Sequence, residues 1–100
     1  MRIRFADEAS VEFLNGISYY EKRQTNLGRR FKLEVEQTIR WLANNSEICQ
    51  LRPGGYRRLN LLIFPYYILY IVRGSTLWIL AIAHQRRIPE YWIQREKNAT

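Results

Sequence analysis

The 100-residue sequence has only one cysteine, one histidine and three prolines, and its apolar runs are short. A lone Cys49 cannot form an internal disulfide, and one histidine with one cysteine is too few for a structural zinc site. The longest apolar run, 61–72, is interrupted by Pro65, whereas a membrane-spanning helix needs about 20 apolar residues. The N-terminus lacks the apolar segment of a signal peptide, and no glycine-rich phosphate-binding motif occurs. These absences predict a cytoplasmic protein without a metal ion or cofactor.

Charge is distributed unevenly along the chain. Hydrophobic residues make up 47% of the sequence, enough for one compact core, so we expect a single domain over residues 1–100. The net charge is +7, and residues 51–100 contribute +6 of it, from eight basic and two acidic side chains. Such a field attracts phosphates or acidic protein segments, but it does not distinguish RNA, DNA and an acidic partner. The alternative is that the positive charge serves only to keep the protein soluble.

The first half of the sequence predicts a strand and two helices. Residues 2–5 alternate charged and apolar side chains, as a short strand at a sheet edge does. Asp7 is placed to cap a helix that runs to about Arg23, and Thr25 or Asn26 to start a second helix. Two helices joined by so few residues form an antiparallel hairpin that covers one face of a sheet. Apolar side chains recur every three or four residues in both helices, at Ala9, Phe13, Ile17 and Tyr20 and at Leu27, Phe31, Val35, Ile39 and Leu42.

The second half predicts most of the sheet. Residues 56–61 are predicted to form a strand after the turn at Pro53-Gly54-Gly55. Residues 66–73 and 76–84 are predicted strands because they are rich in aromatic and β-branched side chains. Pro65 interrupts the ladder because proline cannot donate a hydrogen bond, and Gly74-Ser75 suits a two-residue hairpin. The strands are so apolar that we expect both faces to be covered, the second partly by the C-terminal segment or a partner. Trp41 and Trp78 are predicted to lie in the core.

Three motifs follow one another in the second half. They are Tyr56-Arg57-Arg58, Phe64-Pro65-Tyr66 and the closing run HQRRIPEYW from His84 to Trp92. Together with the order of one strand, two helices and a three-stranded meander, they resemble the RelE/ParE toxin superfamily over nearly the whole chain. The resemblance is closest to its ParE-like, plasmid-stabilisation branch. No single motif is specific, but their joint order is.

The resemblance implies an α+β fold with the order β-α-α-β-β-β, in which a helical hairpin packs on a mostly antiparallel sheet. It also implies the toxin of a type II toxin–antitoxin module, which inhibits growth when free and is neutralised in a hetero-oligomer by a cognate acidic antitoxin. RelE-like members cleave mRNA on the ribosome, whereas ParE-like members act on DNA gyrase. The resemblance therefore leaves the target open.

Metal-independent RNA cleavage needs a base for the 2′-hydroxyl, cations around the phosphate and an acid for the leaving oxygen. The candidate catalytic residues are Arg57, Arg58, His84, Arg86, Arg87 and Tyr91. RelE-like ribonucleases use lysines beside the cleft, whereas residues 52–58 contain none and arginine is a poor base. We therefore favour a ParE-like toxin that acts by binding. The alternatives are a ribosome-dependent endoribonuclease and a degenerate toxin that retains only antitoxin binding.

The residues assigned to target or antitoxin binding are Arg57, Arg58, Arg86, Arg87, Tyr91 and Trp92. Consecutive strand residues point to opposite faces, so at most one of Arg57 and Arg58 faces a given cleft. The other can be solvated or pair with a glutamate of the second helix. His84 can be a hydrogen-bonded packing residue, and Tyr91 with Trp92 can fasten the C-terminal segment to the sheet.

Overall fold

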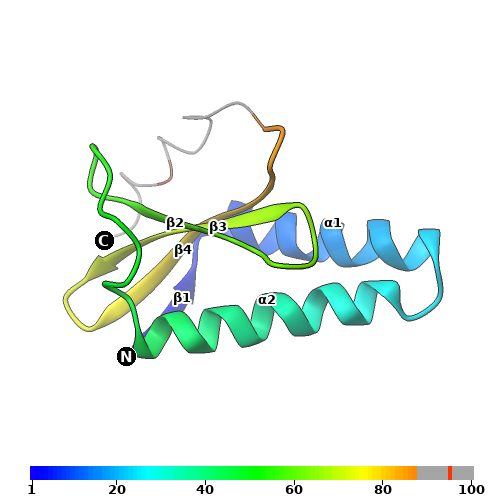
Figure 1. The fold of residues 1–100 in the computed structure, drawn as a ribbon, viewed down its shortest axis with the longest axis horizontal. Coiled ribbons are helices and arrows are strands. Elements are labelled where there is room, and N and C mark those ends of the chain that lie inside the picture. The colour runs from blue at the N-terminus through cyan, green and yellow to red at the C-terminus, as the bar shows by residue number, and fades with distance from the viewer. Residues whose placement is uncertain (88–94, 96–100) are drawn as a thin grey trace.

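A computed structural model of the chain describes residues 1–87 and Arg95. The elements in chain order are β1 (Arg2–Phe5), α1 (Asp7–Arg23), α2 (Leu27–Asn44), β2 (Arg57–Asn60), β3 (Tyr66–Arg73) and β4 (Thr76–His84), shown in Figure 1. The strands form one sheet in the order β1-β4-β3-β2. β3 pairs antiparallel with β2 and β4, whereas β1 pairs parallel with β4. The predicted order of elements and the mostly antiparallel sheet are confirmed.

The starts of the two helices differ from the prediction. α1 begins at Asp7 with Ala6 as its N-cap, so Asp7 does not cap the helix but lies in its first turn, where the helix dipole favours a carboxylate. Asn26 precedes α2 with a φ of 71° and makes no side-chain cap. Instead, the carboxylate of Glu21 accepts the N–H groups of Asn26 at 3.0 Å and Gly28 at 3.1 Å. A glutamate near the end of α1 therefore fastens the start of α2.

The main core lies between the helical hairpin and one face of the sheet (Figure 1). The helices approach so closely that a Cβ atom on Gly16 would lie 2.6 Å from Cε2 of Phe31. Burying each large apolar side chain contributes about 1.5–3 kcal/mol, so this cluster is the main source of stability. Its fully buried side chains include Phe31, Val35, Leu42, Ile68, Tyr70, Leu77 and Ile79.

A second buried cluster lies on the opposite face of the sheet, as the apolar strands predicted. The pairing of β3 with β4 shifts register between Leu69 and Tyr70, which leaves Leu80 without a partner opposite. This bulge puts Leu80 and Ala81 on the same face, and it turns Ile82 toward the helices. The cluster consists of Tyr67, Leu69, Ile71, Leu80, Ala81 and Ala83.

The two tryptophans predicted as core differ in their burial. Trp78 is partly buried against the second cluster, and the guanidinium carbon of Arg4 lies 5.4 Å from the centre of its ring. Trp41 is 45% exposed, so its assignment to the core was wrong. It lies beside Leu59 and Leu62 on the side of α2 that faces the β2–β3 loop. In residues 1–87, no helix has both the length and the apolar character needed to cross a membrane.

Candidate functional site

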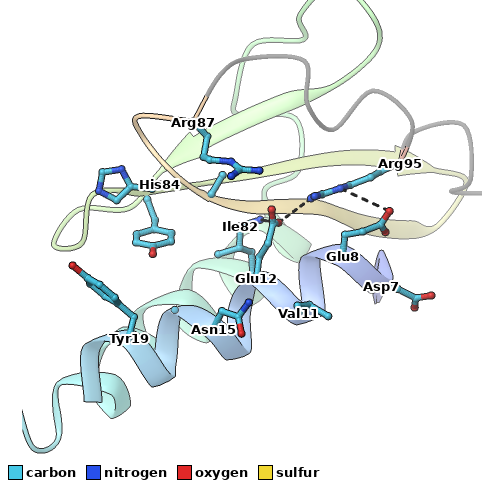
Figure 2. A pocket seen from close by; sticks show the side chains of 13 residues that line it. Asp7, Glu8, Val11, Glu12, Asn15, Tyr19, Ile82, His84, Arg87 and Arg95 are labelled. Atoms are coloured by element: carbon cyan, nitrogen blue, oxygen red, sulfur yellow. Dashed lines mark hydrogen bonds and ion pairs between the residues drawn. The ribbon is translucent and has the colours of Figure 1, made fainter. Parts of the chain in front are cut away.

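A groove of about 670 Å³ lies between α1 and the edge of β4 (Figure 2). β1 accompanies β4 only as far as the pair Phe5–Ile79, and the last backbone bond runs from the N–H of Ala6 to the carbonyl of Ile79. Beyond that point, no strand in the described part of the chain pairs with β4 on the α1 side. The groove is therefore bounded by a helix on one side and by a sheet edge on the other.

Side chains occupy part of this sheet edge. Oε1 of Glu12 accepts the N–H of Ile82 at 3.1 Å, and Nη1 of Arg95 donates to the carbonyl of Leu80 at 3.1 Å. Nη1 of Arg95 also donates to Oε1 of Glu12 at 2.9 Å, and its Nε lies 4.0 Å from Oε2 of Glu8. Only 11% of the Arg95 side chain is exposed. Glu12 and Arg95 thus satisfy backbone groups that a neighbouring strand would otherwise bond.

Aromatic side chains line the other end of the groove. The ring centres of Tyr66 and His84 are 5.4 Å apart in an edge-on contact, and Tyr19 lies across from them on α1 (Figure 2). Burial raises the pKa of Tyr66, and the neighbouring Tyr19 and Glu12 raise it further. Tyr66 is therefore a neutral hydrogen-bond donor at physiological pH, not a base.

His84 is committed to a backbone hydrogen bond. Its Nδ1 accepts the N–H of Arg86 at 3.1 Å, and its carbonyl accepts the N–H of Arg87 at 3.0 Å. A neutral imidazole that accepts at Nδ1 carries its proton on Nε2. Nε2 can then donate a hydrogen bond but cannot remove a proton from a ribose hydroxyl. His84 thus makes a backbone hydrogen bond and an aromatic contact with Tyr66.

Arg57 points toward the loop that follows α2. Its Nη1 donates to the carbonyl of Cys49 and, at 3.4 Å, to that of Glu47. The hydroxyl of Tyr70, opposite Arg57 on β3, donates to the carbonyl of Ser46 at 2.9 Å. These contacts tie the α2–β2 loop to the sheet.

Arg58 lies on the opposite face, as strand alternation predicted. Its guanidinium carbon lies 3.9 Å from the centre of the Tyr67 ring, and its Nε donates to Oδ1 of Asn60 at 3.2 Å. Burial raises the pKa of Tyr67, while the positive charges of Arg58 and Arg87 oppose that rise. The contacts of the two arginines therefore differ from the predicted pairing with a glutamate of α2, because Arg57 bonds backbone carbonyls and Arg58 stacks on a ring.

The predicted site residues do not converge on one cleft. Tyr66 is opposite His84 and Tyr70 is opposite Arg57, which separates the two positions by about 13 Å along β3. Arg87 lines the α1–β4 groove and Arg86 is exposed in the turn after β4. Tyr91 and Trp92, like the helical segment predicted near the C-terminus, lie outside the described residues.

Sequence reasoning missed Glu12 and Arg95. It considered Glu34 only as a possible partner of an arginine of β2, whereas the Glu34 carboxylate accepts N–H groups of residues 62–64. Glu8 and Glu12 are spaced four residues apart, so both lie on one face of α1, and this pattern was the available signal. The partners of these residues could not be read from the sequence, because Glu12 and Arg95 are 83 positions apart. Among residues 1–87 and Arg95, no three histidine, cysteine, aspartate or glutamate side chains are grouped so that they could hold a metal ion.

Comparison with known proteins identifies the family. Residues 3–89 match the model of the ParE toxin of the type II toxin–antitoxin system parDE. Among solved structures, a chain of the chromosomal ParDE toxin–antitoxin system from P. aeruginosa matches with a TM-score of 0.74 at 17% sequence identity. The match covers 84% of this chain and 95% of that one, and it supports the fold. No curated protein matched the chain. Since the family model spans most of its length, the chain belongs to the ParE toxin family of type II toxin–antitoxin systems.

Proposed function

We propose that this protein inhibits growth by binding DNA gyrase in the cytoplasm, and that a ParD-type antitoxin neutralises it through the α1–β4 groove. The observation that carries the first part is the separation of the cationic and proton-transferring side chains. Arg57 holds a loop on one face of the sheet, Arg58 stacks on the other, and His84 lies at the far end of β3 and β4. Such a distribution suits a broad binding surface better than acid–base chemistry at one phosphate.

The α1–β4 groove suits an extended or helical segment of an antitoxin. It offers the sheet edge of β4, where only some backbone groups are engaged by Glu12 and Arg95. Val11 on α1 is 56% exposed and supplies apolar surface, and Arg87 adds positive charge for an acidic partner. The P. aeruginosa structure is described as a ParDE toxin–antitoxin system, which agrees with a partner of this kind.

The target is tested by inducing the protein in bacteria without its antitoxin. DNA supercoiling and DNA breaks are scored in parallel with mRNA integrity and protein synthesis. We expect lost supercoiling or DNA breaks while mRNA stays intact. Early mRNA cleavage with intact DNA would overturn the gyrase assignment in favour of the ribonuclease, and no growth effect would favour a toxin that retains only antitoxin binding.

Two variants separate the two parts of the proposal. Because Nδ1 of His84 is engaged by the backbone, His84→Ala is expected to leave toxicity intact, with thermal melting as the check on folding. Val11→Lys adds a charge on the apolar side of the groove and is expected to weaken antitoxin binding by at least tenfold in a titration. Loss of toxicity in a folded His84→Ala protein would contradict the binding mechanism.

A further inference from the structure

The loop between β2 and β3 exposes two large aliphatic side chains. Leu62 is 97% exposed and Ile63 is 69% exposed, whereas Leu61 and Phe64 on either side are buried in the main core. Isolated exposed leucines are common on protein surfaces. Here, however, two neighbours are exposed together at the tip of a loop whose flanking residues fix it to the core.

Glu34 of α2 holds this tip in place. Its Oε2 accepts the N–H groups of Leu62 at 2.9 Å and Ile63 at 3.0 Å, and its Oε1 accepts the N–H of Phe64 at 3.2 Å. Hydrogen bonds to a charged group are stronger than those between neutral groups. The loop therefore presents Leu62 and Ile63 in a fixed arrangement, so a partner would not have to order the loop on binding.

A groove runs along α2 beside this tip. Two adjoining hollows of about 360 and 420 Å³ share Gln37, Thr38 and Leu62 in their walls. One extends to Leu59 and Trp41, and the other to Leu33, Ile63 and Arg30. Arg30 and Trp41 are eleven residues apart on the helix, which makes the groove about 16 Å long, or three helical turns.

We propose that this α2–loop groove docks an acidic amphipathic helix of the toxin's cellular target. A helix fits better than a strand for two reasons. β2 has only four residues, and in its ladder with β3 the backbone groups of Arg58 and Asn60 alone face outward, too few to pair an added strand. The N–H groups of the loop tip already bond Glu34. The groove therefore offers side chains, which is what a helix with an apolar face requires.

Charge indicates the polar face of that helix. Arg30 lies at one end of the groove, and helical spacing puts Arg29 and Arg40 along its open side with Leu33 between them. Glu36 is the acidic residue on that side, and Glu34 is occupied by the loop. The surroundings are therefore net positive and complement acidic residues beside the apolar face of the partner.

Assignment of this groove to the target, and not to the antitoxin, rests on the proposed function. The α1–β4 groove lies on the β1 side of the sheet, whereas the α2–loop groove lies beside β2 at the other end of the strand order. The two grooves share no lining residue, so a segment bound in the first need not cover the second.

The docking step is tested by titrating the isotope-labelled protein with a designed peptide. The probe is a helix of three to four turns with leucines on one side and glutamates on the other, and a peptide of scrambled order is the control. We expect saturable chemical-shift changes at Gln37, Trp41, Leu62 and Ile63 that weaken as salt is added. Changes centred on Val11 and Ile82, or none that saturate, would overturn the proposal.

A double variant connects the groove to the target. Leu62→Lys with Ile63→Lys should weaken peptide binding at least tenfold and abolish growth arrest, while antitoxin affinity stays within twofold. Ile48→Lys with Leu51→Lys is the matched control, since these aliphatic side chains are 66% and 55% exposed on another loop and should lose neither property. Melting curves establish that both proteins fold. Retained growth arrest, or lost antitoxin binding, in the Leu62/Ile63 variant would refute the assignment. If the unaltered chain does not arrest growth, the proposed function fails, and the peptide titration still decides the docking site.

Discussion

Each of the two helices sends one glutamate to the backbone of the sheet layer, but the two glutamates create different surfaces. Glu12 of α1 accepts a hydrogen bond from the N–H of Ile82 in β4 and forms an ion pair with Arg95. Glu34 of α2 accepts three N–H groups of the β2–β3 loop. The first arrangement leaves a polar, partly occupied sheet edge, and the second holds an apolar tip in water. In both places a carboxylate from a helix bonds backbone N–H groups that no neighbouring strand bonds. The surface that results differs, because Glu12 bonds a sheet edge and Glu34 bonds a loop.

The largest effect is expected from Glu34→Ala. Three N–H groups lose a charged acceptor, and although the exposed ones can bond water, we expect a loss of about 2–3 kcal/mol in the free energy of unfolding. Amide exchange at residues 62–64 should become faster than at β3. Glu34→Gln keeps one acceptor oxygen and should lose less. Equal exchange in all three proteins would show that Glu34 does not hold the loop.

Glu12→Ala should cost somewhat less, about 1–2 kcal/mol, because Arg95 keeps its bond to the carbonyl of Leu80 and lies 4.0 Å from Glu8. A double-mutant cycle with Arg95→Met, followed by chemical denaturation, measures the coupling between the two side chains. Glu8→Ala is the matched control: the carboxylate of Glu8 is half exposed and 4.0 Å from Arg95, so its loss should be nearly neutral. A coupling of zero would mean that the sheet edge does not depend on this pair.

The α2–β2 loop offers a third comparison. It is bonded by the phenol of Tyr70 and the guanidinium of Arg57, and not by a carboxylate. Tyr70→Phe removes the bond to the carbonyl of Ser46 and should cost about 1 kcal/mol at neutral pH. Burial, with the nearby Cys49, raises the pKa of Tyr70 in the folded protein. The neutral phenol is thus favoured by folding, and its contribution is complete below pH about 10 and is lost as the pH rises toward the folded-state pKa.

Unfolding measured from pH 8 to 11 tests this dependence. The unaltered protein should lose stability above pH 10, and Tyr70→Phe should lose less over the same interval. Tyr66 and Tyr67 also have raised pKa values, so the variant should remove only part of the slope. Identical slopes for the two proteins would contradict the assignment to Tyr70.

The smallest effect is expected from Arg58. Its contact with Tyr67 contributes about 0.5–1 kcal/mol, so Arg58→Ala should lower the melting temperature only slightly. Arg57→Ala should lower it more, because the carbonyls of the α2–β2 loop lose a charged donor. Melting curves of the two variants compare the faces of β2 directly. A larger loss for Arg58→Ala would show that the outer face contributes more to stability than the loop contacts do.

Much of the fold could be predicted because its signals are local. The three-to-four-residue spacing of apolar side chains located both helices, and Gly74, with a φ of 60°, begins the predicted turn between β3 and β4. The alternation of strand residues predicted that Arg57 and Arg58 lie on opposite faces of β2, and their contacts differ accordingly. The prediction that Trp41 lies in the core was wrong. The apolar pattern of a helix does not show whether a large residue at the edge of the apolar face packs against the sheet or is exposed to water.

The candidate site was predicted less well. The basic residues were identified from their type, but a charged residue on a short strand can bond a loop, stack on a ring or face a ligand. Glu12 and Glu34 carry the same charge and lie on similar helices, so composition could not separate their roles. Their partners are Ile82, 70 positions away, and the loop at residues 62–64, about 30 positions away.

The sequence by itself determined the order of the elements, the faces that they bury and the excess of positive charge in the second half, because these depend on residue type and local periodicity. Only the tertiary structure decided which backbone groups were left without a strand partner and which side chains reach them. That depends on where β1 ends beside β4 and how the β2–β3 loop meets α2, and both are consequences of packing between segments far apart in the chain.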